Sequence, residues 1–326
     1  MPEKLTYVLP FKAAGAEDLG DLTGYLEALS RVADVIVVDG SEPAEYERHR
    51  GLWGNHVTHV APRPGLGFAN GKVDGVITGV ELAQSEKVVV ADEDVRYDVA
   101  SLQRMSELLD DYDLVRPQNY FDPMPWHALW DTGRTLLNRA LAADYPGTLG
   151  VRRTVFVAAG GYDGDVMFEN LEMIRTMEEA GGSSIAPLDL YVRRLPPESR
   201  HFLAQRPRQA YDDLAQPWRL VAFASILPAA AVAARRGPRL IPLGAAAIVG
   251  LAEAGRRRAG GTRVFPVTAS LMAPVWVVER ALCTWIALAH RALGGVPYRG
   301  SRLRVAANPR RTIRRRLAER SERSRP

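Results

Sequence analysis

The sequence predicts an α/β protein, in which a mostly parallel sheet flanked by helices is followed by an apolar helical region. From residue 7 to about residue 194, runs of β-branched residues alternate with stretches whose apolar residues recur at helical spacing, which is typical of a parallel sheet. After residue 220 the chain changes to long, alanine-rich apolar segments. The 326 residues suffice for one large or two ordinary domains.

The composition limits the kinds of site and bond that the chain can form. The only cysteine is Cys283, so an intramolecular disulfide and a cysteine-rich zinc site are both impossible. Hydrophobic residues make up 47% of the chain, which is enough for a packed core. The first residues, Met1 to Leu5, lack the apolar core of a signal peptide, so we expect the N-terminal domain to stay in the cytoplasm.

The net charge of +4 is unevenly distributed, because arginines accumulate after residue 190. Basic groups beside apolar segments favour an anionic membrane surface, and no nucleic-acid motif accompanies them. We therefore predict a membrane partner and no nucleic acid. The basic groups are Arg235-Arg236, Arg256-Arg257-Arg258, Arg310, Arg311, Arg314, Arg315 and Arg316.

The first strand and helix introduce a candidate binding residue. A strand over residues 7–10, a helix over 19–32 and a strand over 34–41 form a predicted βαβ unit. Asp39 lies at the carboxyl end of the second strand and precedes Gly40, so it is placed to approach a nucleotide. For an isolated Asp-Gly-Ser sequence, a turn cap is an equally good interpretation.

A glycine-rich loop over residues 65–72 ends in Lys72, just before a predicted helix over residues 73–83. Backbone N–H groups at a helix N-terminus, together with a lysine, suit an anionic phosphate. Glycine loops are also common connectors, so the loop alone is weak support for a phosphate site.

The run Lys87 to Ala91 predicts a strand that is buried on both faces, and three carboxylates follow it. In an extended segment Asp92 and Asp94 point to the same side, while Glu93 points to the other. Carboxylates at the carboxyl end of a sheet strand suit a hard divalent cation. Considered alone, the turn is more simply a solvated acidic loop.

Two later segments carry further candidates. Glu169 and Glu172 stand in the first turn of a helix predicted to run to about residue 180, where acidic groups are also ordinary partners of the helix dipole. Arg206 and Arg208, with the amide of Gln205, can clamp a pyrophosphate, although a solvated basic face is the simpler interpretation.

The last third of the chain predicts membrane contact through apolar segments at residues 220–234, 240–252 and 264–293. The first two are shorter than the roughly 20 residues of a perpendicular span, so short spans, a hairpin or interfacial helices all stay open. A soluble helical subdomain is the alternative.

In this order, the motifs resemble the family 2 glycosyltransferases of the GT-A fold, and in particular the membrane-associated branch with ceramide glucosyltransferase-like enzymes. The resemblance covers about residues 5–215. The matching residues are Val37-Val38-Asp39-Gly40-Ser41, Gly71-Lys72, Val90-Ala91-Asp92-Glu93-Asp94, Gly160-Gly161-Tyr162-Asp163, Glu169-Asn170-Leu171-Glu172 and Gln205-Arg206-Pro207-Arg208.

The resemblance implies a Rossmann-like catalytic domain with a donor site. Asp39 resembles the nucleotide-binding aspartate, and Asp92 with Asp94 resembles the pair that contacts the ribose and holds Mg²⁺ or Mn²⁺ on the diphosphate. Gln205 and Arg208 match a Gln-x-x-Arg-Trp element over the donor, but Gln209 replaces its tryptophan. This departure argues against a processive, polymer-making activity.

The resemblance also points to a catalytic base at the start of the helix at residue 169. The family usually has Glu-Asp where this chain has Glu169-Asn170, and an amide cannot accept the acceptor's proton. Glu169 is our predicted base, Glu172 is the alternative carboxylate one turn later, and an impaired enzyme is the third possibility.

We therefore predict a catalytic GT-A domain over residues 1–215, an apolar membrane-associated region over 216–295, and a basic, flexible tail over 296–326. The expected activity is a metal-dependent, inverting hexosyl transfer from a UDP- or GDP-sugar to a hydroxyl of a lipid or membrane-linked acceptor. The expected location is the plasma membrane, with the catalytic domain in the cytoplasm. The alternatives are a nucleotide-binding membrane scaffold without catalysis and a nucleotidyltransferase that releases pyrophosphate.

Overall fold

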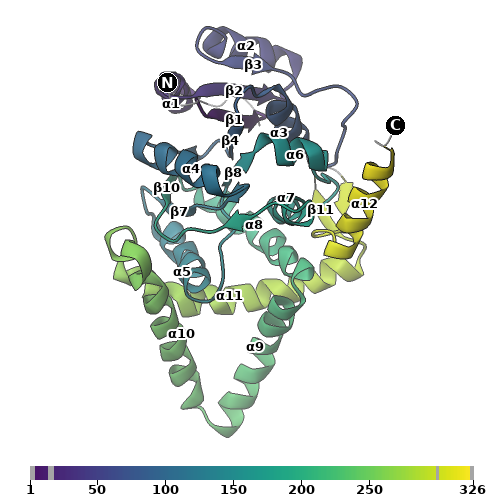
Figure 1. Ribbon diagram of the computed structural model, residues 1–326. Helices are drawn as coiled ribbons and strands as arrows, with labels where there is room; N and C mark the ends of the chain where they lie inside the picture. The colour runs from purple at the N-terminus through teal and green to yellow at the C-terminus, as the bar shows by residue number, and fades with distance from the viewer. Residues whose placement is uncertain (1–3, 14–17, 299–300, 324–326) are drawn as a thin grey trace. The chain divides into compact units, whose positions relative to one another are not determined.

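The computed structural model describes residues 4–13, 18–298 and 301–323. The chain divides into two compact units that alternate along the sequence. Unit 1 comprises Met1–Pro117, Tyr145–Val192 and Asn308–Pro326, and unit 2 comprises Gln118–Asp144 and Arg193–Ala307. This interleaved division differs from the sequential one predicted at residues 215 and 295. Figure 1 shows the ribbon, with labels on the larger elements of both units.

Unit 1 is built on a seven-stranded sheet with the order β3-β2-β1-β4-β8-β6-β9. Only β8 runs antiparallel to its neighbours β4 and β6, while the other pairs are parallel. The mostly parallel sheet predicted from the sequence is therefore confirmed. The strands are β1 (Thr6–Phe11), β2 (Asp34–Asp39), β3 (Thr58–Val60), β4 (Lys87–Ala91), β6 (Leu114–Val115), β8 (Thr148–Arg152) and β9 (Ser184–Ile185).

The central strands are mainly apolar because they face two hydrophobic cores. Alternate residues of one strand enter different cores: Tyr7 and Leu9 lie in one, and Val8 lies in the other. In the same way Val89 and Val90 of β4 enter opposite cores. Such double burial is what a continuous run of β-branched residues predicts.

Helices cover both faces of this sheet. In α3, a Cβ added at Gly79 would lie 2.3 Å from Val8 Cγ1, so this glycine permits the helix to pack closely on β1. The sequence did not predict α2, because only His49 and Trp53 of this largely polar helix are buried. The helices are α1 (Gly20–Ser30), α2 (Pro43–Trp53), α3 (Gly71–Leu82), α4 (Val99–Asp111), α6 (Arg153–Ala159), α7 (Glu169–Glu179) and α12 (Arg310–Arg323).

Unit 2 is mainly helical. The three predicted apolar segments form α9, α10 and α11. Both α10 and α11 pack against α5, α11 also packs against α8, and α9 packs against α11. Two helices, α9 and α11, are long and apolar enough to cross a membrane. The apolar part of α9 is almost entirely exposed, with 6% of it buried, whereas 44% of the apolar part of α11 is buried in the protein. The elements are β7 (Gln118–Phe121), α5 (Trp126–Leu141), α8 (Ser199–Tyr211), α9 (Pro217–Arg236), α10 (Leu240–Arg257), α11 (Val267–Ala292), β11 (Val296–Tyr298) and β12 (Ser301–Leu303).

The segment predicted as a flexible tail contains regular structure. In unit 2, β11 and β12 form an antiparallel pair, and in unit 1 the basic α12 packs against α7. The sequence did not predict this packing because a helix with five arginines among its first seven residues has little apolar periodicity.

Candidate functional site

Three charged side chains from distant parts of unit 1 meet at the carboxyl end of β4. The Lys72 ammonium lies 2.5 Å from Asp92 Oδ1 and 2.6 Å from Glu169 Oε1. Lys72 is at the start of α3, Asp92 directly follows β4, and Glu169 is the first residue of α7. Residues predicted separately as phosphate, nucleotide and proton-transfer groups are thus brought together.

Local structure fixes each of these three residues. The Asn70 side chain caps α3 by accepting a hydrogen bond from the Lys72 N–H. The Asp92 N–H donates to the Gly147 carbonyl oxygen at 2.8 Å, so the acidic turn is tied to the residue before β8. The Tyr162 hydroxyl lies 3.5 Å from Glu169 Oε2. These contacts come from four separate segments, which makes the site a product of the tertiary fold.

The electrostatics of Glu169 suit proton transfer. Its side chain is buried, and this burial raises the pKa of the carboxyl despite the opposing effect of the Lys72 charge. Burial alone would lower the pKa of Lys72, but the carboxylates of Asp92 and Glu169 outweigh this effect and raise it, so the lysine stays charged. A buried carboxylate with a raised pKa beside a fixed cation is a typical general-base environment.

The acidic turn has the alternation expected for an extended segment. Asp92 and Asp94 are half-buried, whereas Glu93 between them is exposed. Among the residues that the structure describes, no group of three or more His, Cys, Asp or Glu side chains could hold a metal ion. The two carboxylates would leave further coordination positions of a divalent ion to water and substrate oxygens. The ammonium held beside Asp92 and Glu169 indicates that this place accepts a cation.

Asp39 has protein partners for both of its carboxylate oxygens. Oδ2 contacts His49 Nδ1 at 2.7 Å and His59 Nε2 at 3.1 Å, and Oδ1 accepts from the Ser41 N–H at 2.9 Å. Burial alone would raise the pKa of Asp39, but the hydrogen bonds from His59, Ser41 and His49 outweigh it and hold the pKa well below its usual range. These contacts fix the end of β2, and nucleotide binding by Asp39 stays a prediction.

The lowered pKa of Asp39 predicts a pH-dependent contribution to stability. A carboxyl group with a depressed folded-state pKa stabilises the fold above its unfolded pKa, about 3.9, and this stabilisation is lost as the pH falls. We expect Asp39→Asn to lower Tm at pH 7, with the difference from the unaltered protein shrinking below about pH 4. Thermal unfolding at several pH values measures this difference. Asp34→Asn, at an exposed ion pair, is the control, and a pH-independent gap for Asp39→Asn would contradict the interpretation.

Glu172 occupies a different environment from Glu169. Its side chain is 1% exposed, and Asn308 donates to both of its oxygens, at 2.7 Å from the backbone N–H and 2.9 Å from Nδ2. Burial raises the pKa of Glu172, although these hydrogen bonds oppose the rise. Both oxygens of Glu172 are held at short distances by the C-terminal segment, whereas Glu169 Oε2 has only the 3.5 Å contact with the Tyr162 hydroxyl. Glu169 therefore stays the predicted base.

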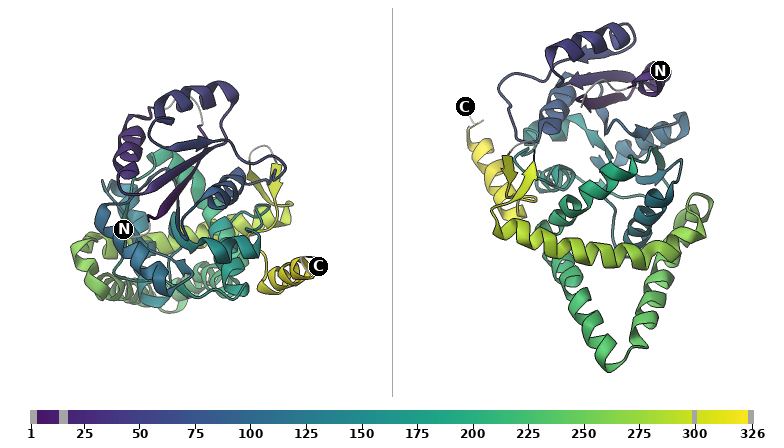
Figure 2. Two further views of the ribbon diagram at one scale, coloured as in Figure 1. Left: turned by 45° about the horizontal axis from the view of Figure 1, so that its top comes forward. Right: turned by 180° about the vertical axis from the view of Figure 1, so that it is seen from behind.

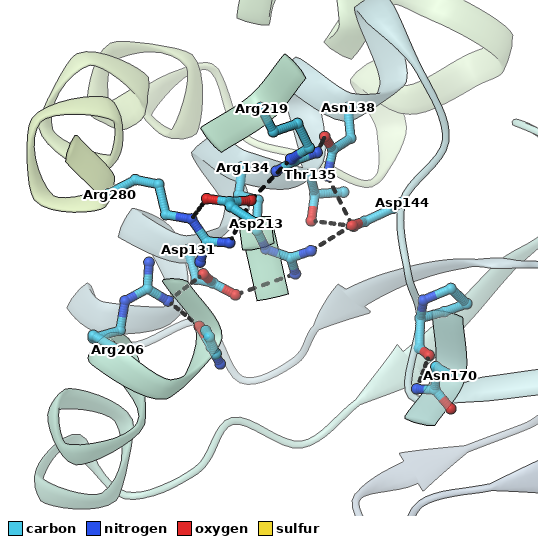
Figure 3. Close-up of polar contacts among 12 residues, drawn as sticks. Asp131, Arg134, Thr135, Asn138, Asp144, Asn170, Arg206, Asp213, Arg219 and Arg280 are labelled. Atoms are coloured by element: carbon cyan, nitrogen blue, oxygen red, sulfur yellow. Dashed lines mark hydrogen bonds and ion pairs between the residues drawn. The ribbon is translucent and has the colours of Figure 1, made fainter. Parts of the chain in front are cut away.

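Asn170 has a hydrogen bond that an aspartate could not make. Its Nδ2 donates to the Pro146 carbonyl oxygen at 3.0 Å, as drawn in Figure 3. An ionised carboxylate is only an acceptor, so an aspartate here would face the carbonyl without a proton to share. The departure from the Glu-Asp pattern therefore has a local structural reason.

The predicted clamp residues lie on α8, in unit 2, and have unlike surroundings. Arg206 is buried, and its guanidinium binds Asp131 Oδ1 at 2.8 Å and also pairs with Glu279. Arg208 is half-buried and stacks on Tyr298, with 5.0 Å between its Cζ and the ring centroid. Within the described residues no carboxylate forms an ion pair with Arg208. The half-buried Gln205 contacts His201. Arg206 thus has a structural role, whereas Arg208 has a charge to offer.

Arg206 belongs to a buried ionic network in unit 2 that the sequence analysis missed. In Figure 3, Asp213 lies between Arg219 of α9 and Arg280 of α11, and Asp144 lies beside Arg134, Thr135 and Asn138 of α5. The charges at the ion pairs balance, with four carboxylates and four guanidinium groups. The available signal was Glu279-Arg280, a charged pair inside an apolar helix. The four acids are Asp131, Asp144, Asp213 and Glu279, and the four bases are Arg134, Arg206, Arg219 and Arg280.

The fold is similar to that of a solved mannosyltransferase. That protein, from Pyrobaculum calidifontis and in complex with GDP-Man and Mn²⁺, has 18% sequence identity and a TM-score of 0.50, with 87% of each chain covered. This likeness confirms the predicted fold class. Mannosyl-3-phosphoglycerate synthase from Rubrobacter xylanophilus matches with 16% identity and a TM-score of 0.42, over 67% of this chain and 74% of that one.

A third solved structure, GalNAc-T7 with UDP, GalNAc and Mn²⁺, matches with 14% identity and a TM-score of 0.40, over 60% of this chain and 44% of that one. No family model and no curated protein matches the chain. The likeness therefore concerns the fold, and the ceramide glucosyltransferase-like branch stays a prediction.

Proposed function

We propose that this protein is a metal-dependent, inverting glycosyltransferase that moves a hexose from a UDP- or GDP-sugar to a hydroxyl group of a lipid or membrane-linked acceptor. The observation that carries this proposal is the junction of Lys72, Asp92 and Glu169 at the carboxyl end of β4. It combines a cation for a diphosphate, a carboxylate for a metal ion, and a buried base.

The residues of this junction divide the chemistry among them. Glu169 accepts the proton of the acceptor hydroxyl, whose oxygen bonds to the anomeric carbon as the nucleoside diphosphate departs. Lys72, held at the start of α3, draws the donor diphosphate toward the helix N-terminus. Asp92 and Asp94 would hold Mg²⁺ or Mn²⁺, which supplies positive charge to stabilise the departing diphosphate.

The remaining donor contacts are assigned by what each side chain already binds. Arg208 is the α8 arginine proposed to contact the diphosphate, because its charge has no ion-pair partner among the described residues. Gln205 is proposed to assist it, whereas Arg206 is engaged by Asp131 and Glu279 and supports α8 instead. Asp39 is proposed to border the nucleoside at the end of β2. The mannosyltransferase of similar fold was solved with GDP-Man and Mn²⁺, which supports a nucleotide-sugar donor and a divalent ion here.

The membrane part of the proposal rests on the exposed apolar surface of unit 2. One side of α11 packs against α5 and α8, while the other exposes apolar residues at intervals of three or four. Figure 2 shows α9 and α10 extending together from α11. We infer that α11 lies along a plasma membrane and that the hairpin of α9 and α10 inserts into it, with unit 1 in the cytoplasm. The exposed residues of α11 are Val267, Leu271, Val275, Val278, Leu282, Trp285 and Ile286.

The alternative function is a membrane-bound scaffold that binds nucleotide without catalysis. Two observations favour it: Asn170 stands where the family has an aspartate, and Gln209 stands where the family has a tryptophan. A turnover assay separates the two functions, because the scaffold releases no nucleoside diphosphate from any donor.

The first test is calorimetric titration of UDP and GDP into the detergent-solubilised protein, with and without Mn²⁺. We expect one of the nucleotides to bind only when Mn²⁺ is present. Asp94→Ala should weaken this binding at least about tenfold, because carboxylate oxygens are the ligands that such ions prefer. Glu93→Ala is the matched control, since this neighbouring carboxylate is exposed. This variant should bind the nucleotide as tightly as the unaltered protein does. Absence of metal-dependent binding in the unaltered protein would contradict the proposed donor site.

A further inference from the structure

Asn308 forms hydrogen bonds through its backbone and its side chain at the point where the chain re-enters unit 1. Its backbone N–H donates to Glu172 Oε2 at 2.7 Å, and its Nδ2 lies 2.9 Å from Glu172 Oε1 and 2.8 Å from Asp163 Oδ2. Its carbonyl oxygen accepts from Arg175 Nη1 at 2.8 Å. With 7% of its surface exposed, Asn308 is an internal connection between the C-terminal segment and α7.

The helix that follows extends this connection along α7. Arg310 pairs with Glu178 and Glu179, and Arg314 pairs with Glu179 as well. Exposed ion pairs of this kind contribute little individually, whereas the buried contacts of Asn308 fix where α12 lies.

The same segment also binds the turn before α7. Arg316 pairs with Asp163, and Arg320 Nη1 donates to the Gly160 carbonyl oxygen at 3.3 Å. Gly160 and Gly161 have positive φ angles, 80° and 73°, so this turn has a backbone that glycine adopts without strain. The C-terminal segment thus holds both α7 and the turn in place.

Glu169 belongs to α7, and it also contacts the turn that precedes this helix. Glu169 begins α7 three residues before Glu172, so the two lie on neighbouring positions of one helix face. Tyr162, whose hydroxyl lies 3.5 Å from Glu169 Oε2, directly precedes Asp163. Asn308 bonds to Glu172, which lies one helical turn after Glu169, and to Asp163, which directly follows Tyr162.

We propose that Asn308 is a positioning residue, which fixes the first turn of α7 and the turn at residues 160–163 so that the Glu169 carboxylate stays against Lys72. This proposal rests on the proposed function, in which Glu169 accepts the acceptor proton. In this proposal Glu172 is the hydrogen-bond acceptor that holds Asn308. Displacing a catalytic group by about 1 Å can cost as much as 10²-fold in rate, so a remote hydrogen bond can control turnover.

The test compares the steady-state kinetics of four variants of the full chain in detergent. Asn308→Ala removes the side-chain bonds, and Asn308→Asp places a carboxylate against those of Glu172 and Asp163. The double variant Asn308→Asp/Glu172→Gln restores a donor opposite the new carboxylate. The control is Arg311→Ala, because Arg311 is exposed and has no ion pair or hydrogen bond among the described residues.

We expect Asn308→Asp to lower kcat by about 10- to 100-fold with the KM for the donor within about twofold. Asn308→Ala should lower kcat less. The double variant should recover part of the loss, because Asp163 still faces the introduced carboxylate, and the control should match the unaltered protein. An unchanged kcat in Asn308→Ala and Asn308→Asp, or a loss that the double variant does not recover, would overturn the positioning role. If Asn308→Asp does not fold, the outcome for Asn308→Ala decides.

Hydrogen exchange of the first-turn amides of α7 provides a readout that does not depend on activity. Exchange there should be faster in Asn308→Ala than in Arg311→Ala, because local opening follows the loss of tertiary bonds. Equal exchange in the two variants would overturn the proposal. If the unaltered protein turns over no donor, the proposed function fails, and the exchange data still decide whether Asn308 holds α7.

Discussion

Replacing Glu169 by Gln is expected to lower turnover by about 10²- to 10⁴-fold, the usual contribution of a general base. The amide keeps the size of the side chain but cannot accept the acceptor's proton. Nucleotide binding should persist, because Lys72 retains its contact with Asp92 at 2.5 Å. The measurements are the initial rate of nucleoside-diphosphate release and the calorimetric Kd on the same preparation.

The exposed residue Glu93 supplies the control, since Glu93→Gln removes a carboxylate from the same region without touching the junction. Asn170→Asp tests the position that the family resemblance favours. We expect it to leave turnover unchanged or lower it, because Asn170 donates to Pro146 and a carboxylate would lose this bond. If Asn170→Asp raised turnover while Glu169→Gln had no effect, the base would have to be sought outside Glu169.

The pH dependence of the rate follows from the same carboxylate. Burial raises the pKa of Glu169, and a general base acts only when it is ionised. The rate should therefore fall as the pH decreases through a pKa above the usual range of glutamate, about 4.3. This acid limb should be absent from the residual activity of Glu169→Gln.

Local patterns in the sequence predicted the strands because each central strand meets two cores and consists mainly of apolar residues, many of them β-branched. They did not predict α2, whose burial depends on only two side chains. They also could not reveal that α5 and α8 pack with the apolar helices of unit 2, since the stretches between them in the sequence belong to unit 1. The sequence contains the periodicity of each helix but no record of its partner.

The candidate site shows the same limit. The types of the residues Lys72, Asp92 and Glu169 pointed to phosphate, metal and proton chemistry, but Lys72 and Glu169 are 97 positions apart, and only the fold brings them to 2.6 Å. The unlike surroundings of Arg206 and Arg208 were likewise unpredictable, because a motif does not tell which arginine has buried acidic partners. Pairing of charges depends on tertiary contacts that a single sequence does not specify.

Asp213→Ala is expected to cause the largest loss of stability in unit 2. The carboxylate is fully buried and accepts from Arg280 Nε at 2.8 Å, from Arg280 Nη2 at 2.9 Å and from Arg219 Nε at 3.2 Å. Removing it leaves two guanidinium groups without their shared counter-charge, which typically costs about 3–5 kcal/mol. Because Arg219 lies in the first turn of α9 and Arg280 lies within α11, we expect the two apolar helices to lose the contact that joins them.

The neighbouring residue Asp212 provides a matched control for this experiment. Burial raises the pKa of Asp212 to about 8, so its carboxyl is largely neutral at pH 7, and Asp212→Asn changes little charge. Thermal unfolding in detergent at pH 7 should show a decrease in Tm of about 5–15 °C for Asp213→Ala and a much smaller change for Asp212→Asn. Equal shifts would mean that the loss reflects disturbance of this turn. A shift confined to Asp213→Ala would identify the ionic contact as the bond that joins α9 to α11 within unit 2.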